Sequence, residues 1–158
     1  MLEQKDIVNE MKVIVFRLQE EEYGVDVHQV KSIERMQHIT RVPRTPDFVK
    51  GVINLRGVVT PIIDLRSRFE LEEFPVTDST RIIIVVVGDV EVGLIVDSAN
   101  DVIDIPLNMI EPPPEIVGGV EAVYLQGVAK LENRLLILLN LDKVLNPEEL
   151  KQLEKMAR

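Results

Sequence analysis

The segment that most constrains the fold of this chain is residues 51–69, which read GVINLRGVVTPIIDLRSRF. Two apolar runs, 52–55 and 58–63, flank the pair Arg56-Gly57. Glycine adopts positive φ without the steric penalty that a Cβ brings, so Gly57 predicts a tight reversal between two strands. The segment therefore predicts a β-hairpin with a lone arginine at its tip. Because the apolar frame does not need that arginine, it is a candidate contact residue.

Short runs rich in valine and isoleucine recur along the chain and predict further strands. They form three expected hairpins, at 13–18 with 23–27, at 81–87 with 91–96, and at 124–131 with 135–141. The first strand of the second hairpin is almost continuously Ile and Val, which is typical of a strand buried on both faces. Residues 72–80, EEFPVTDST, are polar and contain a proline, and they mark the clearest boundary in the chain.

The remaining segments are expected to form short helices and connections. Brief helices are predicted at 28–34, 65–71 and 97–102, a short strand at 39–42, and a flexible loop at Gly118-Gly119. Residues 146–158 carry the clearest helix signals, with Asn146 as N-cap and Pro147 at the first helical position. The apolar stripe of this C-terminal helix either packs onto a barrel end or binds a partner, and we expect packing.

An internal echo organises these segments. Residues 23–27 align with 92–96 at a spacing of 69, and 51–65 align with 127–141 at a spacing of 76. The echo predicts two pseudo-repeated barrel units, roughly 12–71 and 81–146, able to exchange strands within one domain that spans 1–158. Chance similarity between apolar strands is the alternative explanation for part of the echo, and we favour a true repeat. Short, evenly spaced strands with little helix suit small antiparallel barrels.

The inventory of reactive side chains argues against catalysis. The chain has no cysteine and only two histidines, His28 and His38, so it has few side chains that could bind zinc or act as a general acid or base. No serine stands in a G-x-S-x-G frame, and Gly118-Gly119 is not followed by the G-K-[ST] of a phosphate-binding loop. We therefore predict no catalytic residue, no metal site, no cofactor and no enzyme activity.

The charge of the chain is unevenly distributed. The net charge is −9, yet residues 35–68 carry seven basic side chains against two acidic ones, a local net charge of +5. This basic stretch is either a solvated face or a docking surface for an acidic protein. A small barrel that binds nucleic acid through the stretch is the alternative function, but such binding relies on clustered cations and exposed aromatic side chains, and the overall charge disfavours it.

The N-terminal residues 1–12 are of mixed charge and lack the apolar core of a signal peptide. The longest fully apolar runs, 82–87 and 135–139, are far shorter than the roughly 20 residues that span a bilayer. We expect a cytoplasmic protein with no direct membrane insertion.

The motif G-V-I-N-L-R-G-x-x-x-P-x-I-D-L-R of residues 51–66 resembles the signature of CheW-type chemotaxis coupling proteins. Four further motifs extend the resemblance over nearly the whole chain: E-E-Y-G-V-D-V at 21–27, T-P-D-F-V-K at 45–50, V-G-L-I-V-D at 92–97 and L-N-L-D-K-V-L at 139–145. The resemblance implies a mainly β fold of two intertwined small SH3-like antiparallel β-barrels, with short connecting helices and a C-terminal helix.

The resemblance also implies a function. Such proteins are adaptors that couple the cytoplasmic tips of methyl-accepting chemotaxis receptors to the regulatory domain of the histidine autokinase CheA, and they are recruited to membrane receptor arrays. The implied receptor-binding residues are Val30, Asn54, Arg56, Gly57 and Val59. The implied kinase-binding surface is only loosely placed, near Gly93 and Val102. Some relatives carry an acidic residue where this chain has Ser32, so a charged contact there is not carried over.

Two roles for Arg56 remain open at the level of sequence. In one, the arginine contacts a receptor; in the other, it forms a salt bridge within the chain that orders the hairpin. Arg56→Ala separates these roles, because the second predicts a lower melting temperature as well as weaker binding. We favour the contact role.

Overall fold

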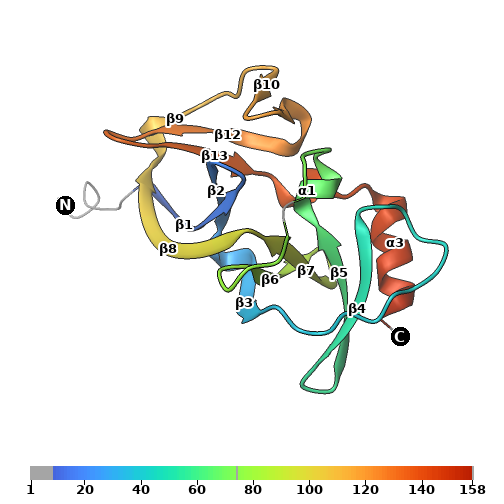
Figure 1. The fold of residues 1–158 in the computed structure, drawn as a ribbon. Helices are drawn as coiled ribbons and strands as arrows, with labels where there is room; N and C mark the ends of the chain where they lie inside the picture. The colour runs from blue at the N-terminus through green and yellow to red at the C-terminus, as the bar shows by residue number, and fades with distance from the viewer. Residues whose placement is uncertain (1–8, 74, 158) are drawn as a thin grey trace, which may run out of the picture.

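Two β-sheets, each assembled from both halves of the chain, form the framework of the computed structural model, which describes residues 9–73 and 75–157 (Figure 1). The first sheet has the strand order β8-β1-β2-β13-β12-β9. Its strands are β1 (Glu10–Leu18), β2 (Glu21–Asp26), β8 (Ser98–Pro106), β9 (Ile110–Glu111), β12 (Leu125–Lys130) and β13 (Leu135–Leu139). Only β1 and β2 of this sheet come from the first half of the chain.

The second sheet has the order β3-β6-β7-β5-β4. Its strands are β3 (Val30–Arg35), β4 (Val49–Leu55), β5 (Val58–Asp64), β6 (Arg81–Val87) and β7 (Val90–Val96). Here the hairpin β6–β7 from the second half inserts between strands of the first half. The predicted unit boundaries, 12–71 and 81–146, remain a prediction, but the sheets are mixtures of the two units.

In the first sheet, the hairpin β1–β2 lies in the same way between β8 and β13 of the second half. Each inserted hairpin pairs with a strand of the other half in parallel, β2 with β13 and β7 with β5. A glycine lies at each junction: Gly24 pairs with Leu138, and Gly93 pairs with Ile62. A Cβ on Gly93 would lie 2.5 Å from Ile62 Cδ1, and one on Gly24 would lie 3.0 Å from Leu138 Cδ2. The close approach of the strands therefore depends on glycine in both halves, which is consistent with the internal echo.

Short helices and one small hairpin connect the strands. They are η2 (Val27–Gln29), α1 (Leu65–Arg68), η3 (Leu107–Met109), β10 (Ile116–Val117), β11 (Val120–Glu121), η4 (Ala122–Tyr124), α2 (Leu141–Val144) and α3 (Pro147–Met156). Asp64 caps α1 by accepting a hydrogen bond from the Arg66 N–H, and Asn140 caps α2 in the same way from the Asp142 N–H. The two halves thus repeat a strand that ends in a capped helical turn.

Apolar side chains are buried on both faces of the strands. Ile82 and Ile84 of β6 belong to a cluster confined to the second sheet, whereas Ile83 and Val85 of the same strand face a central cluster shared by both sheets. A third cluster, which includes Val13 and other residues, is confined to the first sheet. The predicted burial of residues 81–87 on both faces is confirmed.

The C-terminal helix agrees with its sequence signals. Asn146 accepts a hydrogen bond from the Glu149 N–H, and the Glu149 side chain accepts one from the Asn146 N–H, which forms a capping box with Pro147 at the start of the helix. Leu153 is buried in the central cluster, and α3 contacts β5 and β7. The expected packing of this helix onto a barrel is confirmed.

The local predictions for residues 97–102, 28–34 and 39–42 were wrong. Residues 97–102 do not form a helix but lie largely in β8, where Val102 pairs with Ile14 of β1. Residues 28–34 comprise the end of the 3-10 turn η2 and most of β3, which pairs with β6. Both segments have helical apolar spacing, but pairing with a strand distant in the sequence overrides this local pattern.

Residues 39–42 form no strand, and Thr40 alone makes a β-bridge, with Val52. Gly118 and Gly119, expected in a flexible loop, form the turn of the β10–β11 hairpin with φ of 60° and 84°. Some predictions concern residues outside those that the structure describes. The prediction that the N-terminus is not a signal peptide rests partly on residues 1–8, the predicted boundary 72–80 includes Phe74, and the predicted C-terminal helix ends at Arg158.

Candidate functional site

The turn between β4 and β5 presents Arg56 to solvent. Arg56 and Gly57 both have positive φ, 52° and 86°, and Leu55 pairs with Val58, which is the two-residue hairpin geometry that matches the twist of the strands. Asn54 Oδ1 accepts a hydrogen bond of 2.8 Å from the Gly57 N–H. The predicted reversal at Gly57 is confirmed, and the turn is held by a side chain immediately before it.

Four of the five predicted receptor-binding residues meet at this turn. Asn54 and Val59 pair across the hairpin, and Asn54, Arg56 and Gly57 are exposed. Val30 belongs to another strand: it begins β3, whose Glu34 contacts Arg56, and it packs partly buried against the central cluster.

Arg56 is not unpaired. Its Nη2 lies 3.4 Å from Oε2 of Glu34 in β3. The turn that begins at β4, one edge strand of the second sheet, therefore contacts β3, the other edge strand. The Arg56 side chain is nevertheless 72% exposed, whereas Glu34 is 16% exposed. A single long contact at an exposed guanidinium stabilises the fold by little, about 0–1 kcal/mol, and leaves other donors of Arg56 facing solvent.

Most of the basic stretch is neutralised within the chain. Of its seven cations, Lys50 pairs with Glu73, Arg56 with Glu34, Arg66 with Asp64 and Asp97, and Arg68 with Glu149. The remaining three are exposed and lie close together in the sequence: Arg35, Arg41 and Arg44. The local charge of +5 therefore does not form one continuous basic surface.

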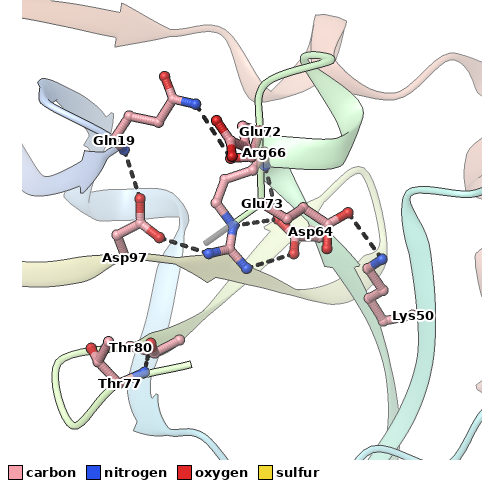
Figure 2. Close-up of polar contacts among 9 residues, drawn as sticks. All are labelled: Gln19, Lys50, Asp64, Arg66, Glu72, Glu73, Thr77, Thr80 and Asp97. Atoms are coloured by element: carbon pink, nitrogen blue, oxygen red, sulfur yellow. Dashed lines mark hydrogen bonds and ion pairs between the residues drawn. The ribbon is translucent and has the colours of Figure 1, made fainter. Parts of the chain in front are cut away.

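The sequence analysis missed a buried ionic cluster at the junction of the two sheets (Figure 2). Arg66, 3% exposed, donates to Asp64 at 2.9 and 2.8 Å and to Asp97 Oδ1 at 2.7 Å. Asp97 in turn accepts from the Gln19 N–H in the β1–β2 turn. The hydrogen bonds that Arg66 donates to Asp64 raise the pKa of Arg66 against the opposing effect of burial. The available signal was the I-D-L-R spacing of residues 63–66, which places both charges beside one helix start.

The two predicted kinase-binding residues differ in accessibility. Val102 is 52% exposed on β8, an edge strand of the first sheet. Gly93 is buried beside Ile62 and Ile82, so a partner cannot contact it without displacing the sheet. An effect of substitution at Gly93 would act through packing, and the assignment of both residues to a kinase surface remains a prediction.

The described residues contain neither a group of side chains that could hold a metal ion nor a helix that could cross a membrane. Among residues 9–73 and 75–157, no group of three or more His, Asp or Glu side chains could hold a metal ion. The closest cluster of charged groups, around Arg66, has its carboxylates turned towards the guanidinium. No helix in the described part of the chain is long and apolar enough to cross a membrane.

The fold defines a mainly β protein of two barrels that exchange strands, with the β4–β5 turn exposed on one of them. A family model described as a CheW-like domain matches residues 12–149. The chain therefore belongs to the CheW family of chemotaxis proteins.

Individual relatives agree with this assignment. The chain is 51% identical over 137 residues to the chemotaxis protein CheW of Bacillus subtilis, covering 87% of this chain and 88% of the relative. It is 39% identical over 145 residues to CheW of Klebsiella aerogenes, covering 92% and 87%. Its structure is similar to the crystal structure of the scaffolding protein TtCheW from Thermoanaerobacter tengcongensis, with a TM-score of 0.80, 37% identity and coverage of 88% and 90%.

Proposed function

We propose that this protein is a non-catalytic adaptor that couples the cytoplasmic tips of chemoreceptors to the regulatory domain of the histidine autokinase CheA. The observation that carries the proposal is the exposed guanidinium of Arg56, held on a rigid turn in a chain of the CheW family. In this role the protein acts by geometry: it holds receptor and kinase together and transforms no substrate.

The β4–β5 turn is suited to recognition because its conformation is fixed before a partner arrives. A non-glycine residue with positive φ carries a backbone penalty, which Arg56 accepts at a turn position where glycine or asparagine is usual. The hydrogen bond from Gly57 N–H to Asn54 and the contact with Glu34 hold this geometry. A preorganised arginine loses less freedom on binding than a mobile one, and arginine is enriched among residues that dominate binding energy.

The receptor surface that we propose comprises the turn residues Asn54, Arg56, Gly57 and Val59, with Val30 as a further member on β3. A helical receptor tip would lay apolar side chains against this region while Arg56 fixes its register. The kinase would bind elsewhere, near the exposed Val102 on β8, and recruitment to receptor arrays in the cytoplasm follows from these two contacts.

The test is the affinity of a purified receptor tip fragment for Arg56→Ala. We expect a loss of about 2 kcal/mol, or roughly 30-fold in Kd, with an unchanged melting temperature. Lys151→Ala is the matched control, because Lys151 is an exposed cation on α3. Unchanged affinity in a folded Arg56→Ala protein would contradict the proposed contact.

A second variant separates the two roles of Arg56. Glu34→Gln removes the internal partner of the arginine. If Arg56 acts as a contact, receptor affinity is retained or increased in this variant. If the arginine only orders the hairpin through Glu34, both Arg56→Ala and Glu34→Gln lower the melting temperature and weaken binding to a similar extent.

Nucleic-acid binding through residues 35–68 is the weaker candidate. Four cations of that stretch are committed to carboxylates of the chain, and Phe48 and Phe69 are buried instead of being displayed for base stacking. Absence of binding to single-stranded oligonucleotides at low salt would exclude it.

A further inference from the structure

A pocket of about 600 Å³ lies away from the residues assigned to receptor and kinase. One wall is the segment that joins β3 to β4, residues 36–48, which we call the strap. Pro75 and Val76 also line the pocket, as do Asp64 and Arg66 of the buried cluster. None of Val30, Asn54, Arg56, Gly57, Val59, Gly93 or Val102 lines it.

The strap is fixed against β4. Thr40 and Val52 exchange two backbone hydrogen bonds of 2.8 Å. Gly51, with φ of 142°, lies directly beneath the Thr40 carbonyl, where a Cβ would collide with the strap backbone. Pro43 and Pro46 further restrict the strap, so residues just after Thr40 occupy defined positions.

Two arginines on the strap line the pocket and have no partner in the part of the chain that the structure describes. Arg41 and Arg44 are exposed, and neither makes an ion pair or a side-chain hydrogen bond among the described residues. Every other described arginine except Arg35 has such a partner. Among the described residues, the arginines without such a partner are therefore confined to one short segment, 35–44, in a chain whose net charge is −9.

The backbone at Arg44 indicates that its side chain is retained at some cost. Arg44 follows Pro43 and has φ of 62°, and a proline followed by positive φ is the pattern of a turn that usually takes glycine at the second position. An arginine in the left-handed region carries a conformational penalty that glycine would avoid. An arginine where glycine would be less strained is typical of positions at which the side chain itself has a function.

The other charges of the pocket are already paired. Arg66 is bound by Asp64 and Asp97, and Lys50 lies 3.1 Å from Glu73, as Figure 2 shows beside the buried cluster. Among the described lining residues, this leaves Arg41 and Arg44 against one exposed carboxylate that has no basic partner, that of Asp47, because the exposed Glu73 is paired with Lys50. Apolar side chains complete the lining, with Ile39 and Val42 half-buried and Val76 58% exposed.

We propose that this pocket binds an acidic segment of a partner protein, with carboxylates paired to Arg41 and Arg44 and an apolar side chain packed against Val76. Arginine binds carboxylates in a two-point geometry, and uncompensated cations beside apolar lining favour a peptide that carries both kinds of group. The site is separate from the β4–β5 turn, so the protein can hold this partner and a receptor at the same time.

The probe is a short fluorescein-labelled peptide of alternating glutamate and leucine, with binding followed by fluorescence anisotropy on the full chain. We expect saturable binding that weakens as salt is raised, because the contacts are exposed ion pairs. The double variant Arg41→Gln/Arg44→Gln should lose about tenfold or more in affinity. The matched control, Lys143→Gln/Lys151→Gln, removes the same charge from exposed positions of α2 and α3, outside the pocket, and should lose less than about twofold if binding is local.

A further variant tests the apolar part of the site. Val76→Glu places a carboxylate on the exposed rim and should weaken the acidic peptide, with melting temperature as the check on folding. Equal losses in the two double variants would overturn the proposal, because they would indicate general charge attraction. So would binding of a lysine–leucine peptide with similar affinity, or tighter binding of a single-stranded oligonucleotide that Arg41→Gln/Arg44→Gln abolishes.

Discussion

Arg68 in α1 and Glu149 in α3 form a two-point ion pair between residues 81 positions apart, with Nη1–Oε2 of 3.1 Å and Nη2–Oε1 of 3.0 Å. Arg68 Nε also donates to the Val144 carbonyl at 2.8 Å, and the guanidinium lies 4.6 Å from the centroid of the Phe48 ring. Arg68, in the first half of the chain, therefore attaches the C-terminal helix α3 to the barrels through these contacts.

Arg68→Met should loosen this attachment. Methionine keeps an apolar stem but removes both hydrogen bonds from Arg68 to Glu149, which among the described residues then accepts only from the Asn146 N–H, and the bond from Arg68 Nε to the Val144 carbonyl. We therefore expect the free energy of unfolding to fall by about 1–3 kcal/mol. Urea denaturation measures the change. Lys151→Met, at an exposed position of the same helix, is the control, and an equal effect of both substitutions would show that Arg68 has no special role.

Removing Arg66 should be more severe. Arg66→Met leaves Asp64, 1% exposed, as a buried carboxylate without its main partner, and such a loss costs about 3–5 kcal/mol. Adding Asp64→Asn to Arg66→Met should recover part of the stability, because the uncompensated charge is then gone. Thermal and urea unfolding of both variants provide the measurement, and a single variant as stable as the native chain would refute the structural role of the cluster.

The pair formed by Arg134 and Glu22 should make stability depend on pH. Hydrogen bonds from Arg134 lower the pKa of Glu22 from 4.5, so the pair stabilises the fold above that pH and the contribution is lost as pH falls further. Arg134→Gln should therefore reduce the free energy of unfolding at pH 7, and the difference from the native chain should shrink towards pH 3. A difference that stayed constant over this range would exclude the ion pair as its cause.

Tyr23→Phe should increase stability. The Tyr23 hydroxyl is buried without a hydrogen-bond partner among the described residues, and burial raises the pKa of Tyr23 to about 12. Phenylalanine keeps the stacking of this ring on Phe16, at a centroid distance of 5.7 Å, and removes the unsatisfied group. We expect a gain of about 1 kcal/mol in the free energy of unfolding; a loss of similar size would mean that the hydroxyl has an acceptor.

Local patterns in the sequence were sufficient for much of the secondary structure. The hairpins β6–β7 and β12–β13, the turn at Gly57 and the capped helix α3 all follow from residue types within a few positions of each other. Strand β8 was mistaken for a helix over 97–102 because its strand geometry depends on pairing with β1, which lies far away in the sequence.

The electrostatics of the candidate site could not be read from sequence in the same way. Counting charges over 35–68 suggested a basic surface, but the partners of Arg66 and Arg68 include Asp97 and Glu149, which only the fold brings near. Arg56 was expected at an exposed turn and lies there, yet its contact with Glu34 depends on the approach of β3. The resemblance to the CheW family implied intertwined barrels, and strands from both halves do share each sheet.

The adaptor role is tested most directly by reconstituting receptor fragments, the kinase CheA and this protein, with kinase autophosphorylation as the readout. We predict that receptor control of the kinase requires the protein, and that Arg56→Ala, folded as judged by its melting temperature, restores control only at higher concentration. Lys151→Ala should behave as the native chain. A kinase that responds equally to receptor without this protein would contradict the account.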